Sequence, residues 1–128
     1  MSTTLLFLAA THGTGALISS YIAASAILRR PSLFSTNLAI FGFALSWWTI
    51  FQGFEIITPT AEGSFLWTSI AYPGIQVSVL SLLSICYGLS SGTNRIPAWI
   101  WAILCIIPAI TTGITLTNPW HTLMWRNM

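Results

Sequence analysis

Residues 31–54, PSLFSTNLAIFGFALSWWTIFQGF, form a long run without a charged side chain. An α-helix needs roughly 20 such residues to cross the hydrocarbon core of a bilayer. Further charge-free runs lie on both sides of this one, over residues 1–28, 63–94 and 96–125. We therefore predict four transmembrane helices, over residues 4–28, 35–57, 65–89 and 97–117, and an outer interfacial tail over residues 118–128.

The composition places the whole chain in the membrane. Of its 128 residues 55% are hydrophobic and only 5% are charged, and its mean hydropathy is +0.80. Soluble domains carry about 25% charged residues, so the surface of this chain is not suited to water. The four helices account for nearly all of the sequence. We expect one all-α integral membrane domain, a four-transmembrane-helix bundle over residues 1–128.

The distribution of arginine predicts the orientation of the helices. The first apolar run has no charge before it and is followed by Arg29 and Arg30, the reverse of a cleaved signal peptide. With the N-terminus outside, Arg29, Arg30 and Arg95 fall in inner loops and only Arg126 lies outside, as the positive-inside rule requires. We therefore expect both termini on the outer side. Orientation already accounts for the arginines, so the net charge of +2 does not indicate a nucleic-acid partner.

The first helix carries small residues at helical spacing. Thr11, Gly15, Ser19 and Ala23 follow one another at intervals of four. Small residues at this spacing let helix backbones approach closely in lipid. Two interpretations are open: the stripe packs inside this protein's own bundle, or it docks against another polypeptide.

Polar side chains gather in the predicted outer leaflet. They come from three helices and the tail, and five of them are candidate ligand-binding residues: His12, Gln52, Glu55, Tyr72 and His121. Gln52 and Glu55 are three apart and share a helix face, and a carboxylate in hydrocarbon requires a partner. Three interpretations are open: Glu55 extends to the surface while His12 bonds a carbonyl, the group binds a polar ligand, or His12, Glu55 and His121 bind a metal. Two histidines give no metal-binding spacing, so we predict no metal site.

Two features lie deeper in the predicted membrane. Trp47 and Trp48 fall near the middle of the second helix, where they either fill space or line a pocket for an apolar ligand or pigment. Pro73 and Pro108 interrupt the third and fourth helices, which transmembrane helices tolerate. No residue pair resembles a nucleophile with its base, and we expect no enzyme activity. The sequence indicates no cofactor, although a bound lipid or pigment is compatible with it.

A family resemblance covers residues from Phe41 to Trp125. The sequence resembles the N-terminal half of the seven-helix membrane sensor region of bacterial histidine kinases. The second helix matches at Trp48, Gly53, Phe54 and Glu55, and the third at Trp67, Tyr72 and Gly74. The fourth gives the strongest match, at Pro108, Ala109, Thr117, Asn118, Pro119, His121, Leu123 and Trp125.

The resemblance implies a sensor-like helical bundle in a bacterial cytoplasmic membrane. It also implies that the closing TNPWHTLMW motif is an outer helix cap, with Asn118 and Pro119 ending the helix. In such a family three more helices and a cytoplasmic transmitter follow this cap, whereas the 128 residues stop there, so we expect a different output. Our first hypothesis is a small non-catalytic subunit that docks in and stabilises a larger membrane complex, with lipids and other integral membrane subunits as partners. The alternatives are a stand-alone sensing module that signals through a separate partner and, third, a membrane enzyme or transporter.

Overall fold

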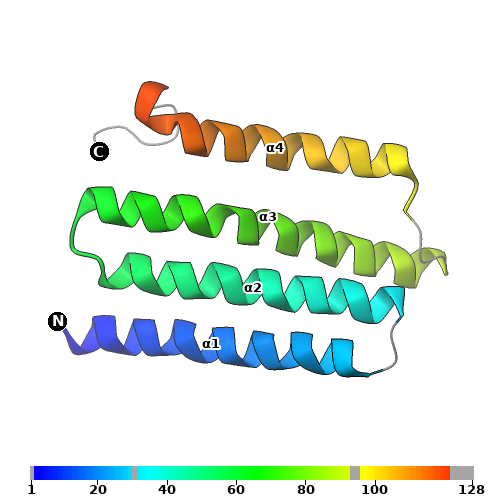
Figure 1. The fold of residues 1–128 in the computed structure, drawn as a ribbon, viewed down its shortest axis with the longest axis horizontal. Coiled ribbons are helices and arrows are strands. Elements are labelled where there is room, and N and C mark those ends of the chain that lie inside the picture. The colour runs from blue at the N-terminus through cyan, green and yellow to red at the C-terminus, as the bar shows by residue number, and fades with distance from the viewer. Residues whose placement is uncertain (1, 30–31, 93–95, 122–128) are drawn as a thin grey trace.

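Four long α-helices make up the part of the chain that the structure describes (Figure 1). This computed structural model describes residues 2–29, 32–92 and 96–121. The helices are α1 (Thr3–Leu28), α2 (Leu33–Ile57), α3 (Ala61–Ser91) and α4 (Ala98–His121). Each is long and apolar enough to cross a membrane, and the predicted all-α, four-span class is confirmed.

Hydroxyl side chains set the beginnings of the first three helices. The Ser2 and Thr60 side chains accept hydrogen bonds from the backbone N–H groups of Leu5 and Gly63. Ser32 and Ser35 form a reciprocal capping box at the start of α2. Such caps satisfy donors that the first turn of a helix leaves free. Because Thr60 caps α3, that helix begins four residues earlier than the sequence predicted.

The end of α4 differs from the prediction. The helix continues through Asn118 and Pro119 to His121 instead of ending at Thr117. A proline keeps a helix-compatible φ, so the helix can continue through Pro119 although the hydrogen bond to the carbonyl four residues earlier, that of Thr115, is lost. The first part of the expected outer tail is therefore the last turn of α4. The rest of that tail, with Leu123 and Trp125, lies outside the described residues.

The helices lie in a row in chain order (Figure 1). Each is antiparallel to the next, and α1 packs on α2, α2 on α3 and α3 on α4; the described residues make no contact between helices further apart in the row. The first two interfaces are extensive, whereas α4 touches α3 only sparsely. The start of α1, the end of α2, the start of α3 and the end of α4 therefore share one end of the row, called here the N-terminal end.

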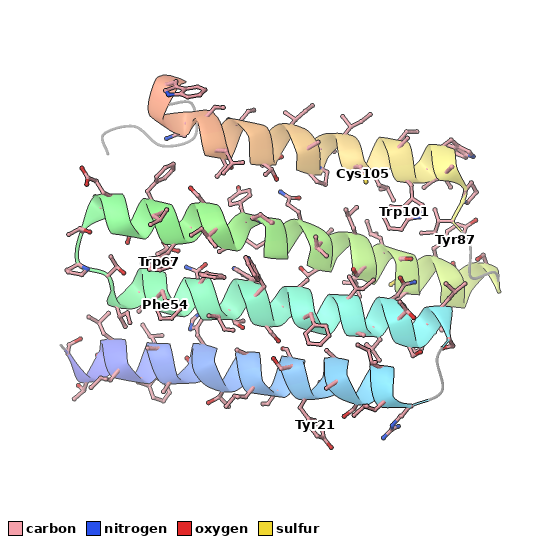
Figure 2. The ribbon with its side chains drawn as sticks, viewed as in Figure 1. Tyr21, Phe54, Trp67, Tyr87, Trp101 and Cys105 are labelled. Atoms are coloured by element: carbon pink, nitrogen blue, oxygen red, sulfur yellow. The ribbon has the colours of Figure 1, made fainter. Side chains whose placement is uncertain are left out.

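Small residues form the interface between α1 and α2. A Cβ atom at Gly42 would lie 2.8 Å from the Ser19 carbonyl oxygen and 2.9 Å from the Ala23 Cβ. The Ser46 hydroxyl donates to the Ala16 carbonyl oxygen at 3.1 Å. Large apolar side chains instead lie exposed, as Tyr21 does on the side of α1 turned away from α2 (Figure 2). This distribution suits a lipid environment, where close helix contact requires small residues.

The interface between α2 and α3 combines close backbone contact with a hydrogen bond. A Cβ atom at Gly74 would lie 2.9 Å from the Ala44 carbonyl oxygen and 3.0 Å from the Trp48 backbone nitrogen. The Trp47 indole N–H donates to the Ile70 carbonyl oxygen at 2.8 Å. The two helices are therefore held together near the middle of the predicted membrane span.

Candidate functional site

A hydrogen-bonded chain of three side chains runs along the last turns of α2. The Trp48 indole N–H donates to Gln52 Oε1 at 3.3 Å, and Gln52 Nε2 donates to Glu55 Oε2 at 2.6 Å. The spacings of four and three residues place all three side chains on one helix face. All three are half-buried. We call Trp48, Gln52 and Glu55 the polar chain.

The start of α3 lies next to the polar chain. The Ser64 hydroxyl donates to the backbone carbonyl of Glu55 at 3.4 Å. Trp67 packs on Phe51 and Phe54, with ring centroids 5.9 and 5.1 Å apart (Figure 2). Phe51 and Phe54 of α2 thus pack against Trp67 of α3 near the end of α2. The arrangement presents a carboxyl group, oriented by an amide, at the edge of an apolar helix pair.

No basic side chain accompanies Glu55 in the described part of the chain. Arg29 is the one arginine in the described ranges, and it lies beyond the end of α1, at the opposite end of the row. Arg30, Arg95 and Arg126 lie outside those ranges. A carboxylate at the edge of hydrocarbon requires a partner that offsets its desolvation. Gln52 supplies one hydrogen bond to this carboxylate but no positive charge.

His12, in α1, lies against a different face of α2 from the face that carries Glu55. A Cβ atom at Gly53 would lie 3.5 Å from the His12 Cβ, so this histidine borders the α1-facing side of α2. Its Nδ1 lies 2.8 Å from the Leu8 carbonyl oxygen of its own helix. Glu55, two residues after Gly53, is rotated by about 200° around the helix. The structure therefore separates His12 from the polar chain.

Tyr72 and His121 complete the set predicted from the sequence. Tyr72 is half-buried in α3 and lies about 12 Å further along that helix than Ser64, at 1.5 Å per residue. His121 is the last residue of α4, and its side chain is outside the described part of the structure. Of the five predicted residues, the structure brings Gln52 and Glu55 into direct contact. No group of three histidine, cysteine or acidic side chains meets among the described residues.

The small-residue stripe of α1 faces α2 along most of its length. Ser19 and Ala23 contact the position of Gly42, and a Cβ atom at Gly15 would lie 3.9 Å from Thr49 Cγ2. Thr11 is exposed and donates its hydroxyl to the Leu8 carbonyl oxygen at 2.7 Å. These contacts favour the first of the two interpretations from the sequence, in which the stripe packs inside this protein's own bundle.

Two buried polar residues near the N-terminal end, Ser69 and Thr115, were missed by sequence reasoning, and the burial of a third, Asn118, was not predicted. Ser69 in α3 is 8% exposed and its hydroxyl has no hydrogen-bond partner among the described residues, whereas Thr115 and Asn118 in α4 are 0% and 2% exposed. Ser69 lies about 140° around α3 from Gly74, on the side turned from α2 toward α4. The sequence does carry a signal for the two residues of α4. Polar residues follow one another at intervals of four and three, at Thr111, Thr115 and Asn118, which places them on one helix face.

Comparison with known proteins identifies a family. A protein-family model, described as the N-terminal 7TM region of histidine kinase, matches residues 13–128. The match confirms the resemblance inferred from the motifs after Phe41 and extends it back into α1. No curated protein and no solved structure matches the chain.

Proposed function

The chain belongs to the family of N-terminal seven-transmembrane regions of histidine kinases, and on this basis we propose that its four helices form the sensory part of a membrane receptor. The observation that carries the proposal is the polar chain, in which Gln52 holds the Glu55 carboxyl group by a 2.6 Å hydrogen bond. We assign no catalytic step to it. The proposed role is to receive a small ligand at the N-terminal end of the row.

The chemistry of the polar chain indicates a class of ligand. A carboxylate at the edge of hydrocarbon is stabilised most by a cation, and no described arginine reaches Glu55. Phe51 is four residues before Glu55, on the same helix face, and packs on Trp67; aromatic faces attract cations at close range. We therefore propose a small organic amine, bound as its ammonium ion between Glu55 and these rings.

Thermal unfolding of the purified protein in mild detergent tests this function. The probes are methylammonium, butylammonium and spermidine, with methanol and butanol as uncharged controls. A ligand that binds only the folded state raises its stability, by about 2.7 kcal/mol at one hundred times the dissociation constant. We expect an amine to raise the unfolding temperature of the wild type and to have no such effect on Glu55→Gln.

Glu62 offers a matched control for this test. It is an exposed acidic residue in the first turn of α3, at the same end of the row. Glu62→Gln changes the net charge as Glu55→Gln does but leaves the polar chain intact, so it should keep the response to amines. Equal stabilisation of the Glu55→Gln variant would refute the proposed site, and no stabilisation of the wild type by any amine would refute the ligand class.

A second candidate role, docking in a larger membrane assembly, is favoured by the open row. Both α1 and α4 pack on one neighbouring helix only, and α4 does so sparsely. A Cβ atom at Gly113 in α4 would meet no neighbouring atom of the described residues within 4 Å. We propose that further transmembrane helices lie against this side of α4.

Gly113→Trp should then abolish co-purification of such helices from native membranes, whereas Gly13→Trp, at an equally open site on α1, should not. Unchanged co-purification of Gly113→Trp would exclude α4 as the docking surface.

The proposed orientation places the N-terminal end of the row outside a bacterial cytoplasmic membrane. It is supported by Arg29 at the opposite end, because cytoplasmic loops carry an excess of arginine and lysine. In a background without Cys86 and Cys105, Ser2→Cys should react with a membrane-impermeant maleimide on intact cells. Ser91→Cys should react only after lysis, and the reverse pattern would invert the topology.

A further inference from the structure

An apolar groove lies between α2 and α3, away from the polar chain. Its volume is about 340 Å³ and it is open along one side. Seven residues line it: Ile40, Phe43, Ala44, Trp47, Pro73, Gly74 and Val77. Ala44 and Gly74 are buried and form its floor, and the larger residues are exposed and form its rims.

The groove lies at the centre of the predicted membrane span. Ala44 is next to the midpoint of α2, and Val77 is next to the midpoint of α3. Helices of this length place their midpoints in the hydrocarbon core. The medium that meets the open side of the groove at this depth is therefore the acyl chains of the lipids.

The chemistry of the lining excludes an occupant with a polar group at this depth. Almost all of the exposed lining is apolar. The one side-chain N–H among the lining residues belongs to Trp47, and it is already bonded to the Ile70 carbonyl oxygen. A polar atom placed here would lose its hydrogen bonds to water without replacement. An occupant that is hydrocarbon along its whole buried length meets no such cost.

We propose that this groove binds one fatty-acyl chain of a membrane phospholipid. Its volume is roughly twice the 150 Å³ of an engineered protein cavity that accepts benzene, which suits a segment of a single chain. An acyl chain fills the groove with dispersion contacts to Phe43, Trp47 and Val77. No described helix covers the open side. The lipid thus becomes part of the α2–α3 interface, next to the Trp47 hydrogen bond.

Lipid retention during purification tests the proposal. The protein is purified in mild detergent with extensive washing, and phospholipid is quantified per chain by mass spectrometry. We expect the wild type to retain a stoichiometric phospholipid and Val77→Trp, which fills the groove, to lose it. Val79→Trp is the matched control, because Val79 is exposed in the same helix but does not line the groove. Ile40→Trp fills the groove from α2 and gives a second variant if Val77→Trp does not fold.

A photoreactive lipid locates the bound chain. The probe is phosphatidylcholine with a diazirine in the middle of one acyl chain, incorporated into phosphatidylcholine vesicles with the wild-type protein. We expect crosslinks to concentrate on Phe43, Trp47 and Val77. Crosslinks spread evenly over the exposed residues of α2 and α3, or retention that is equal in the filled variants and the wild type, would overturn the proposal. A protein partner retained over the groove by the purified wild type, in place of lipid, would also overturn the proposal.

Discussion

The Trp47 indole nitrogen lies 2.8 Å from the Ile70 carbonyl oxygen, to which it donates a hydrogen bond from α2 to α3. Ile70 lies three residues before Pro73, inside a helix that continues through this proline. Proline cannot donate to the carbonyl four residues earlier and crowds the preceding turn. The indole therefore stabilises α3 at the turn that its proline weakens.

Removing this hydrogen bond should destabilise the protein by a small, measurable amount. Trp47→Phe keeps an aromatic ring but has no N–H to donate to Ile70. Hydrogen bonds between transmembrane helices contribute about 0.6 kcal/mol on average and up to about 1.7, and we expect a loss in that range. The free energy of unfolding is measured by dodecyl sulfate titration in mixed micelles, followed by circular dichroism. Trp99→Phe, at an exposed position of α4, should change it little, and equal losses for both variants would contradict the role of Trp47.

Close backbone contact should make Gly74 intolerant of substitution. The Cβ of Gly74→Ala would lie 2.9 Å from the Ala44 carbonyl oxygen and 3.0 Å from the Trp48 nitrogen, both backbone atoms that cannot rotate away. Overpacking of this kind costs about 1–3 kcal/mol. Gly13→Ala, with no neighbouring atom within 4 Å, should instead be neutral or stabilise α1 by up to about 1 kcal/mol. The same titration compares them, and a Gly74→Ala variant as stable as Gly13→Ala would refute the contact.

Two serines, one paired and one unpaired, should respond in opposite directions. Ser69 is buried and its hydroxyl has no partner in the part of the chain that the structure describes, so Ser69→Ala removes an unsatisfied group and should leave stability unchanged or raise it. The Ser46 hydroxyl lies 2.9 Å from the Gly42 carbonyl oxygen and 3.1 Å from the Ala16 carbonyl oxygen, and it accepts from Ser20. Ser46→Ala should therefore lower stability by about 0.5–1.5 kcal/mol. Unfolding in mixed micelles again provides the comparison. A marked loss in Ser69→Ala would instead show that its hydroxyl binds a group such as an ordered water.

The sequence predicted the number and type of elements but not their arrangement. Charge-free runs indicate where each helix lies, because the length of apolar chain that crosses a membrane follows from local composition. The row of helices could not be predicted from the same pattern. The helices are apolar on all sides, so no hydrophobic face shows which side meets a neighbour. Helix contacts depend instead on small residues such as Gly42 and Gly74, whose partners are far away in sequence.

The candidate site was predictable only within one helix. Gln52 and Glu55 share a face by their spacing, and the structure joins them by a hydrogen bond. The direction of His12 depends on how α1 is rotated against α2, which periodicity within α1 does not determine. The buried position of Ser69 likewise depends on packing around α3.

The sparse contact between α3 and α4 should make α4 the least protected helix toward hydrogen exchange. Local opening requires less free energy where few packed contacts are lost, and α2, packed between α1 and α3, should exchange most slowly. Hydrogen–deuterium exchange of the protein in detergent, read by mass spectrometry over residues 33–57 and 98–118, measures this difference. The other edge helix, α1, is the control, because it also has a single neighbour but packs on it extensively. Protection of α4 equal to that of α1 would show that α4 is held as firmly as the other helices. It would then be unsuited to move against α3, a movement that a sensory module could use to transmit the binding of a ligand.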